Sequence, residues 1–90
     1  MSKFQFTEIA WSEYLLWQFE DKRTLKKINE LLKDIERNGA LNGLGKPERL
    51  KGELSGYCSR RIDDKNRIIY KSIKDDIIEI YSLKGHYQDK

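Results

Sequence analysis

The spacing of hydrophobic residues changes along the 90-residue chain and divides it into segments of different period. Residues Phe4–Thr7 alternate between apolar and polar side chains, which predicts a short strand. Thr7 can then cap a helix, because its hydroxyl can accept from the first free backbone N–H groups. Apolar residues recur at helical spacing in this first helix: Trp11, Tyr14, Leu15 and Phe19.

A second helix is predicted over Lys22–Asn38. One apolar stripe, with charged residues in most other positions, runs along it through Leu25, Ile28, Leu32 and Ile35. We expect the helix to close at Asn38-Gly39, since glycine adopts the left-handed conformation that a helix end requires.

The periodicity disappears between Gly39 and Gly56, where five of the six glycines and the single proline occur, so we expect a loop region. Three alternating segments follow and predict strands over Tyr57–Ile62, Arg67–Ile73 and Ile77–Leu83. The short spacers between them favour antiparallel hairpins. The order β-α-α-β-β-β predicts one α+β domain over residues 1–90, with two helices packed on one face of a small, mainly antiparallel sheet. The other face is left for a partner.

Positive charge is concentrated in residues 44–71, where eight Lys and Arg against four Asp and Glu give +4, more than the +3 of the whole chain. Clustered cations suit a polyanionic partner, although an ordinary solvated face would look the same. The lone Cys58 cannot form an intramolecular disulfide, which favours a reducing compartment. No apolar run suits a signal peptide or a membrane span, so we expect a cytoplasmic protein without a membrane partner.

Candidate chemistry surrounds the last three predicted strands. Side chains alternate along a strand, so Arg60 and Arg61 face opposite ways and only one of them is expected to reach a substrate. A hairpin would bring Arg67 to the same level. Further candidates come from the preceding loop, where Lys46 and Lys51 flank Glu48, and from the region after the last strand, which holds His86 and Tyr87.

This set of residues fits RNA cleavage without a metal, in which the neighbouring 2′-hydroxyl attacks the phosphate. Glu48 could act as the base and His86 as the acid, because an ordinary imidazole pKa of about 6.5 lies near working pH. Arg61, Arg67 and Lys51 could hold the charge that develops on phosphorus. One histidine and one cysteine do not make a standard metal site, so we expect no metal and no cofactor. From this pattern alone, a small basic RNA-binding domain is the more prudent interpretation.

Six short motifs in fixed order make the chain resemble a known family. They are Lys22-Arg23 with Lys26 to Leu31, Gly45-Lys46-Pro47-Glu48 with Leu50-Lys51, Leu54-Ser55-Gly56, Ser59-Arg60-Arg61-Ile62, Asn66-Arg67-Ile68-Ile69-Tyr70, and His86-Tyr87. Over essentially the whole chain, this order resembles the Txe/YoeB toxin family of the RelE-like mRNA interferases. Departures from the family pattern are Arg49, Cys58, Asn66 and the extension Gln88-Asp89-Lys90.

The resemblance implies a microbial-ribonuclease fold and an endoribonuclease that cleaves mRNA in the ribosomal A site. It implies the toxin half of a type II toxin–antitoxin pair, inhibited by a cognate antitoxin of the YefM/Phd type, and it leaves a homodimer open. By position it implies the catalytic residues Glu48, Arg67, His86 and Tyr87, and the substrate-binding residues Lys46, Lys51 and Arg61. Two alternatives stay open: a non-catalytic RNA- or ribosome-binding module, and a protein-interaction domain that acts in corepression.

Overall fold

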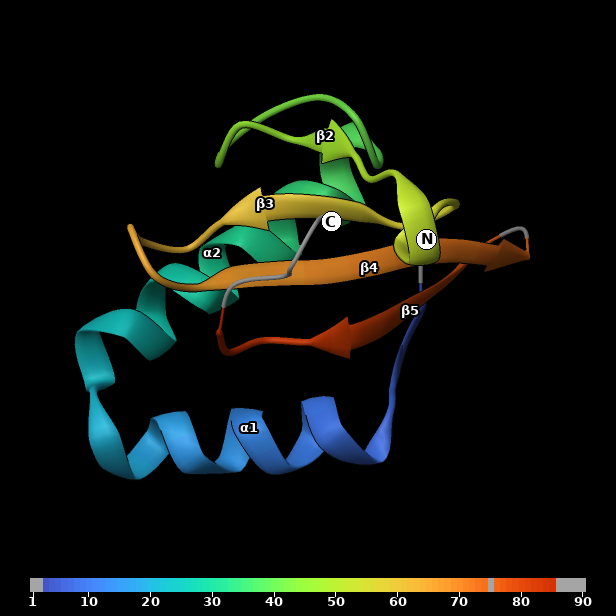
Figure 1. Ribbon diagram of the computed structural model, residues 1–90. Helices are drawn as coiled ribbons and strands as arrows, with labels where there is room; N and C mark the ends of the chain where they lie inside the picture. Colours follow the sequence, from blue (N-terminus) through green and yellow to red (C-terminus); the bar gives the residue numbers. More distant parts are fainter. Residues whose placement is uncertain (1–2, 75, 86–90) are drawn as a thin grey trace.

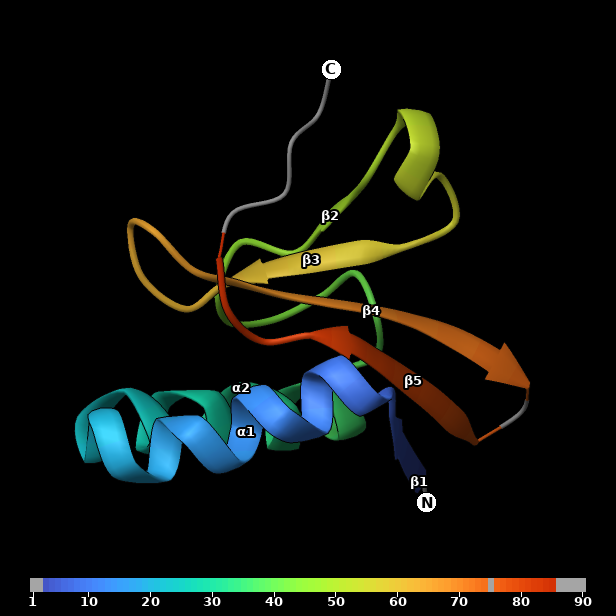
Figure 2. The ribbon, with the colours of Figure 1, turned by 60° about the horizontal axis from the view of Figure 1, so that its bottom comes forward.

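A computed structural model describes residues 3–74 and 76–85 of the chain and shows two helices packed on one face of a five-stranded sheet (Figures 1 and 2). The helices are α1 (Glu8–Glu20) and α2 (Lys22–Asn38). The strands are β1 (Lys3–Phe6), β2 (Glu48–Arg49), β3 (Cys58–Arg61), β4 (Arg67–Lys74) and β5 (Ile77–Ser82), with a 3-10 turn, η1, over Gly52–Leu54. The α+β fold class and the element order predicted from the sequence are therefore confirmed, with β2 and η1 added inside the region expected to be a loop.

The strands are ordered β1-β5-β4-β3-β2. Three of the four neighbouring pairs are antiparallel. The exception is β1, the first strand of the chain, which lies parallel to β5, the last. Figure 2 shows α1 and α2 side by side beneath the sheet, with β2 and the loop before it at the opposite edge from β1. No helix formed by residues 3–74 and 76–85 covers the other face of the sheet.

Helix α2 contributes the predicted stripe to the core. Ile28, Leu32 and Ile35 are buried, and Leu31 joins them. Asp21 caps the helix by accepting hydrogen bonds from the backbone N–H groups of Arg23 and Thr24. The helix ends as predicted, with Gly39 at a φ of 89°.

Most of the residues that helix α1 buries are not the apolar residues predicted from helical spacing. Thr7 caps it as expected, accepting from the Ala10 N–H at 3.0 Å. The buried residues are Ala10 and Trp17, and the indole Nε1 of Trp17 donates to the Leu83 carbonyl at 2.9 Å. Trp11, Leu15 and Phe19 lie exposed, so only Tyr14 of the predicted positions faces inward. The helix is apolar on nearly every side, and periodicity alone therefore does not select its buried face.

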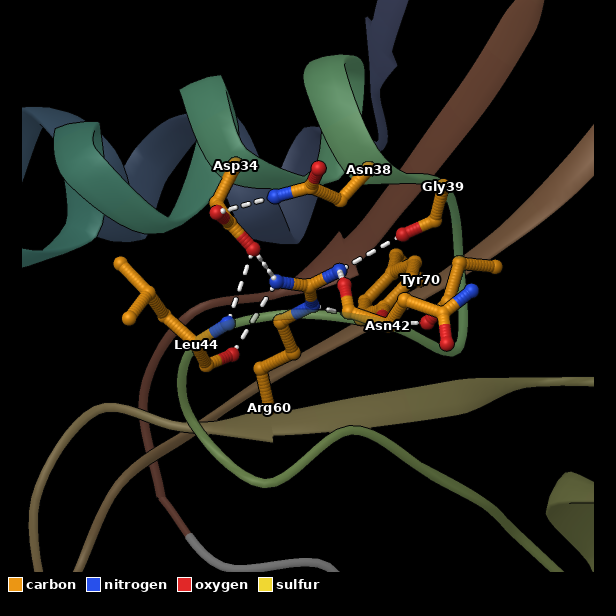
Figure 3. A network of polar contacts seen from close by, with 8 residues as sticks. Asp34, Asn38, Gly39, Asn42, Leu44, Arg60 and Tyr70 are labelled. Atoms are coloured by element: carbon orange, nitrogen blue, oxygen red, sulfur yellow. Dashed lines mark hydrogen bonds and ion pairs between the residues drawn. The ribbon is translucent and has the colours of Figure 1, made fainter.

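An arginine, Arg60, is completely buried between the sheet and the loop that follows α2 (Figure 3). Its guanidinium forms an ion pair with Asp34 of α2 and donates to the hydroxyl of Tyr70 at 3.0 Å. It also donates to three loop carbonyls, those of Gly39, Asn42 and Leu44. A buried charge is tolerated only when its donors are satisfied. Here the helix, the strand and the loop together provide the acceptors. The network therefore fixes residues 39–44 against β3 and β4.

None of the helices in the described part of the chain is long and apolar enough to cross a membrane.

Candidate active site

Four charged side chains proposed from the sequence line one shallow pocket of about 110 Å³ at the end of the sheet: Lys46, Glu48, Arg61 and Arg67. They come from four places in the chain, namely the loop before β2, β2 itself, the last residue of β3 and the first residue of β4. One carboxylate is thus set among three cations. Such a pocket suits an anionic ligand that also has a proton to give up.

Strand register explains why these side chains meet. Arg61 lies directly opposite Arg67 in the β3–β4 hairpin, and Glu48 lies opposite Ser59 in the β2–β3 pair. Ser59 and Arg61 share a face of β3, since alternate side chains of a strand point the same way. The hairpin and the two-residue β2 therefore bring Glu48 and both arginines to one edge of the open face.

The loop that carries Lys46 is held close to the end of β3. The Arg61 backbone N–H donates to the Gly45 carbonyl at 2.6 Å, and Arg60 fixes the preceding residues as described above. Lys46 has a φ of 52°, a left-handed conformation that is uncommon for a residue with a Cβ. Strained backbone of this kind gathers at functional sites when the surroundings enforce it.

Arg67 is oriented by backbone carbonyls. Its guanidinium donates to the Asp63 carbonyl at 3.0 Å and, at 3.4 Å, to the Asn66 carbonyl. Neutral acceptors of this kind fix the side chain without cancelling its charge. The positive charge of Arg67 therefore stays available at the pocket.

Asn66 has a structural role that the sequence did not reveal. Its side-chain oxygen accepts from the Gly85 N–H at 2.7 Å, and its amide donates to the Asp63 carboxylate. The Arg67 N–H donates in turn to the Gly85 carbonyl at 3.1 Å. These bonds fix Gly85, the residue before His86 in the chain, beside the start of β4. In the sequence, the only indication of this role was that Asn66 directly precedes Arg67.

Of the remaining site predictions, one falls away from the pocket and two fall on residues that the structure does not describe. Lys51 is exposed at the start of η1 and does not line the pocket. His86 and Tyr87 lie outside the described residues. The prediction that Arg60 and Arg61 face opposite ways is confirmed, since Arg60 is buried and Arg61 is exposed; which of them reaches a substrate stays a prediction.

Residues 3–74 and 76–85 contain no group of three or more His, Cys, Asp or Glu side chains able to hold a metal ion. The pocket itself has a single carboxylate among three cations. Its positive charge repels a divalent cation and attracts phosphate.

A second, larger pocket of about 310 Å³ lies at the β2–β3 edge of the sheet. Its lining is mainly apolar, hydroxyl or backbone, with Arg49 as the one charged side chain. The smaller pocket is therefore the site at which acid–base and phosphate chemistry can meet.

Known proteins are similar to this chain in both sequence and fold. A family model described as YoeB-like toxin of bacterial type II toxin–antitoxin system matches residues 6–87. Toxin YoeB of Synechocystis sp. is 49% identical over 86 residues, which cover 96% of this chain and 98% of that toxin.

Solved structures of toxins from this family are also similar to the chain. The heterotetrameric complex of YoeB-YefM toxin-antitoxin from Staphylococcus aureus contains a chain with a TM-score of 0.87 and 49% identity, covering 97% of this chain and 99% of that one. The YoeB dimer from Staphylococcus aureus gives a TM-score of 0.88 and 50% identity, with 96% and 98% covered.

Two helices on a mixed five-stranded sheet, with this likeness to solved toxins, define a RelE-like fold. Within that class, the chain belongs to the YoeB toxin family of bacterial type II toxin–antitoxin systems.

Proposed function

We propose that this toxin is an endoribonuclease that cleaves mRNA in the ribosomal A site and so inhibits translation. The observation that carries the proposal is the pocket in which Glu48 lies among Lys46, Arg61 and Arg67. A phosphodiester bound by the three cations would place its ribose beside the only carboxylate of the pocket. This is the arrangement that attack by a 2′-hydroxyl requires.

The reaction proceeds by acid–base chemistry without a metal. Glu48 takes the proton of the 2′-hydroxyl while the 2′-oxygen forms a bond to phosphorus. The bond from phosphorus to the 5′-oxygen breaks, and His86 protonates the leaving 5′-oxygen. Arg67 stabilises the charge on the phosphoryl oxygens, and Tyr87 is the fourth catalytic residue of the proposal. Lys46, Lys51 and Arg61 bind the RNA backbone. The products are a 2′,3′-cyclic phosphate and a 5′-hydroxyl.

The toxin acts in the cytoplasm, with the ribosome and mRNA as its substrate complex and a YefM-type antitoxin as its inhibitor. The relatives from Staphylococcus aureus occur as a YoeB-YefM complex and as a YoeB dimer, which supports an antitoxin partner and a homodimer for this chain as well.

Glu48→Gln tests the proposal against a non-catalytic RNA- or ribosome-binding module. This nearly isosteric change removes the base, so single-turnover cleavage on programmed ribosomes should fall by roughly 10²- to 10⁴-fold while ribosome binding is retained. Glu53→Gln, which changes an exposed carboxylate in η1, is the matched control and should cleave as the wild type does. A wild-type toxin that binds without cutting, or that leaves a 5′-phosphate, would contradict the mechanism.

A further inference from the structure

Two tyrosines and a lysine form a cluster on the open face of the sheet, apart from the charged pocket. We call Tyr57, Tyr81 and Lys71 the aromatic shelf. The two rings are 5.1 Å apart between centroids and inclined at 53°, and the Lys71 Nζ lies 4.6 Å from the centre of the Tyr57 ring. Tyr57 and Lys71 are half-buried, whereas Tyr81 is 37% exposed.

The shelf lies on the same face as the pocket. Tyr57 precedes Arg61 by four residues on the β3 segment, and Lys71 follows Arg67 by four residues on β4. Side chains an even number of residues apart share a face, and four residues of strand span roughly 13 Å. The shelf and the cationic pocket are therefore two parts of one continuous surface.

Alternation along β5 places Tyr81 on this face, two residues after Glu79, and a β-bulge lies at Tyr81 itself. Ile80 lies opposite Tyr70 and Ser82 lies opposite Ile69, so Tyr81 is the extra residue of β5. The Thr7 hydroxyl donates to the Tyr81 carbonyl at 2.8 Å and holds the bulged backbone. Bulges re-aim side chains and occur often beside active sites. Tyr81 adds nothing to the buried core between the sheet and the helices, and its ring instead enlarges the open face.

Charge in the shelf is balanced. Lys71 lies opposite Glu79 in the β4–β5 register, and the Tyr57 hydroxyl donates to the Glu79 carboxylate at 3.5 Å. The shelf therefore has little net attraction for a phosphate, in contrast to the pocket with its three cations. Its aromatic surface suits an uncharged, flat ligand group.

We propose that the aromatic shelf binds a nucleobase of the single-stranded RNA whose phosphate is held in the pocket. The proposal rests on RNA being the toxin's substrate. Proteins that bind single-stranded RNA combine cations along the backbone with aromatic rings on which bases stack, and both elements lie on this one face. The shelf extends the binding surface from the cleaved linkage to a neighbouring nucleotide.

Tyr81→Leu and Tyr81→Phe test the stacking directly. The probe is a short single-stranded RNA with a 2′-deoxy residue at the cleavage position, which blocks the reaction, and binding is measured at low salt by fluorescence anisotropy. Tyr81→Leu keeps apolar bulk but loses the ring, so its Kd should rise roughly five-fold or more. Tyr81→Phe keeps the ring and should remain within about two-fold. Phe19→Leu on the exposed face of α1 is the control and should bind as the wild type does.

A series of RNAs, each lacking one base, identifies the stacked nucleotide. At one position, loss of the base should weaken the wild type and leave the affinity of Tyr81→Leu unchanged. Equal affinities of the wild type and Tyr81→Leu for intact RNA would overturn the proposal, as would a Tyr81→Leu defect that persists with every abasic RNA. A defect confined to antitoxin binding would assign the shelf to a protein instead. Failure of cleavage on ribosomes, with this base-dependent binding intact, would contradict the proposed reaction but not the shelf.

Discussion

Hydrogen bonds connect Gly85 to Asn66 and Arg67 at the start of β4. The Gly85 carbonyl accepts from the Arg67 N–H, and the Gly85 N–H donates to the Asn66 side chain. Gly85 therefore has a fixed place beside the cationic pocket.

His86→Ala should slow single-turnover cleavage on ribosomes by roughly a hundred-fold or more, the usual scale for losing a positioned acid. Ribosome binding should change little, because most of its affinity would come from distributed Lys and Arg charges. The measurement is the rate of the chemical step at saturating ribosome, with a melting curve to confirm folding. A folded variant that cuts within a few-fold of the wild type would remove the acid role.

The sequence predicted that Arg60 and Arg61 would point to opposite faces, because alternation depends only on neighbouring residues. It could not reveal what Arg60 does, since that depends on distant partners. Asp34, Tyr70 and three loop carbonyls converge on the guanidinium only once the helix, the loop and two strands are assembled. Pocket residues from β3 and β4 were predictable from the hairpin register, whereas the exclusion of Lys51 from the pocket depends on the path of an irregular loop.

At the scale of elements, α1 shows the limit of hydrophobic periodicity. A helix apolar on one stripe reveals its buried face, as α2 does, but α1 has large apolar residues around its circumference. Its buried face is decided by close packing at Ala10 and by the hydrogen bond from Trp17 to Leu83. Likewise, β2 is only two residues long, too short for any alternation to predict it.

Trp17→Ala and Phe19→Ala should differ sharply in stability although they lie two residues apart on α1. Trp17 is 6% exposed and Phe19 is 90% exposed. Truncating the buried indole should cost about 3–5 kcal/mol of the free energy of unfolding. Truncating the exposed phenyl ring should change it by no more than about 0.5 kcal/mol. Urea unfolding of the two variants measures this difference. Equal losses in the free energy of unfolding would contradict the assignment of the buried face.

Because Asp34 of α2 pairs with Arg60, we expect acid to weaken the packing of α2 and residues 39–44 against the sheet. The hydrogen bond from Arg60, with one from the Leu44 N–H, lowers the pKa of the Asp34 carboxyl below its ordinary value. A lowered pKa contributes stability above the pKa of the unfolded chain, about 3.9, and this contribution is lost as pH falls through the lower folded value. Asp34→Asn should therefore melt at a lower temperature at neutral pH and lose less stability than the wild type on acidification below about pH 4.

Asp21 and Asp63 also have lowered pKa values and remain in both proteins, so the difference between the two acid melting profiles isolates Asp34. Parallel profiles for the wild type and Asp34→Asn would show that the pair adds no pH-dependent stability.

At the scale of the whole molecule, the two sides of the sheet have different chemistry. The helix side of the fold ends in the apolar outer surface of α1, where Ile9, Trp11, Leu15, Leu16 and Phe19 are exposed. The open side presents the cationic pocket and the aromatic shelf. If RNA is the substrate, as proposed, a partner on the open side neutralises the toxin most directly, because it competes with RNA for the same surface.

We therefore expect an acidic segment of the cognate antitoxin to bind across the pocket that contains Arg61 and Arg67. Carboxylates there would occupy the sites proposed for RNA phosphates, so binding should block ribosome association and weaken with added salt. Because the antitoxin binds the folded toxin, it should also raise its melting temperature in a concentration-dependent way. Co-purification, thermal shift and hydrogen-exchange protection measure these effects, and Arg61→Ala should weaken the complex while Phe19→Ala leaves it unchanged. Protection confined to the outer face of α1, with the segments around Arg61 and Arg67 still exchanging freely, would place the antitoxin on the helix side and contradict this prediction.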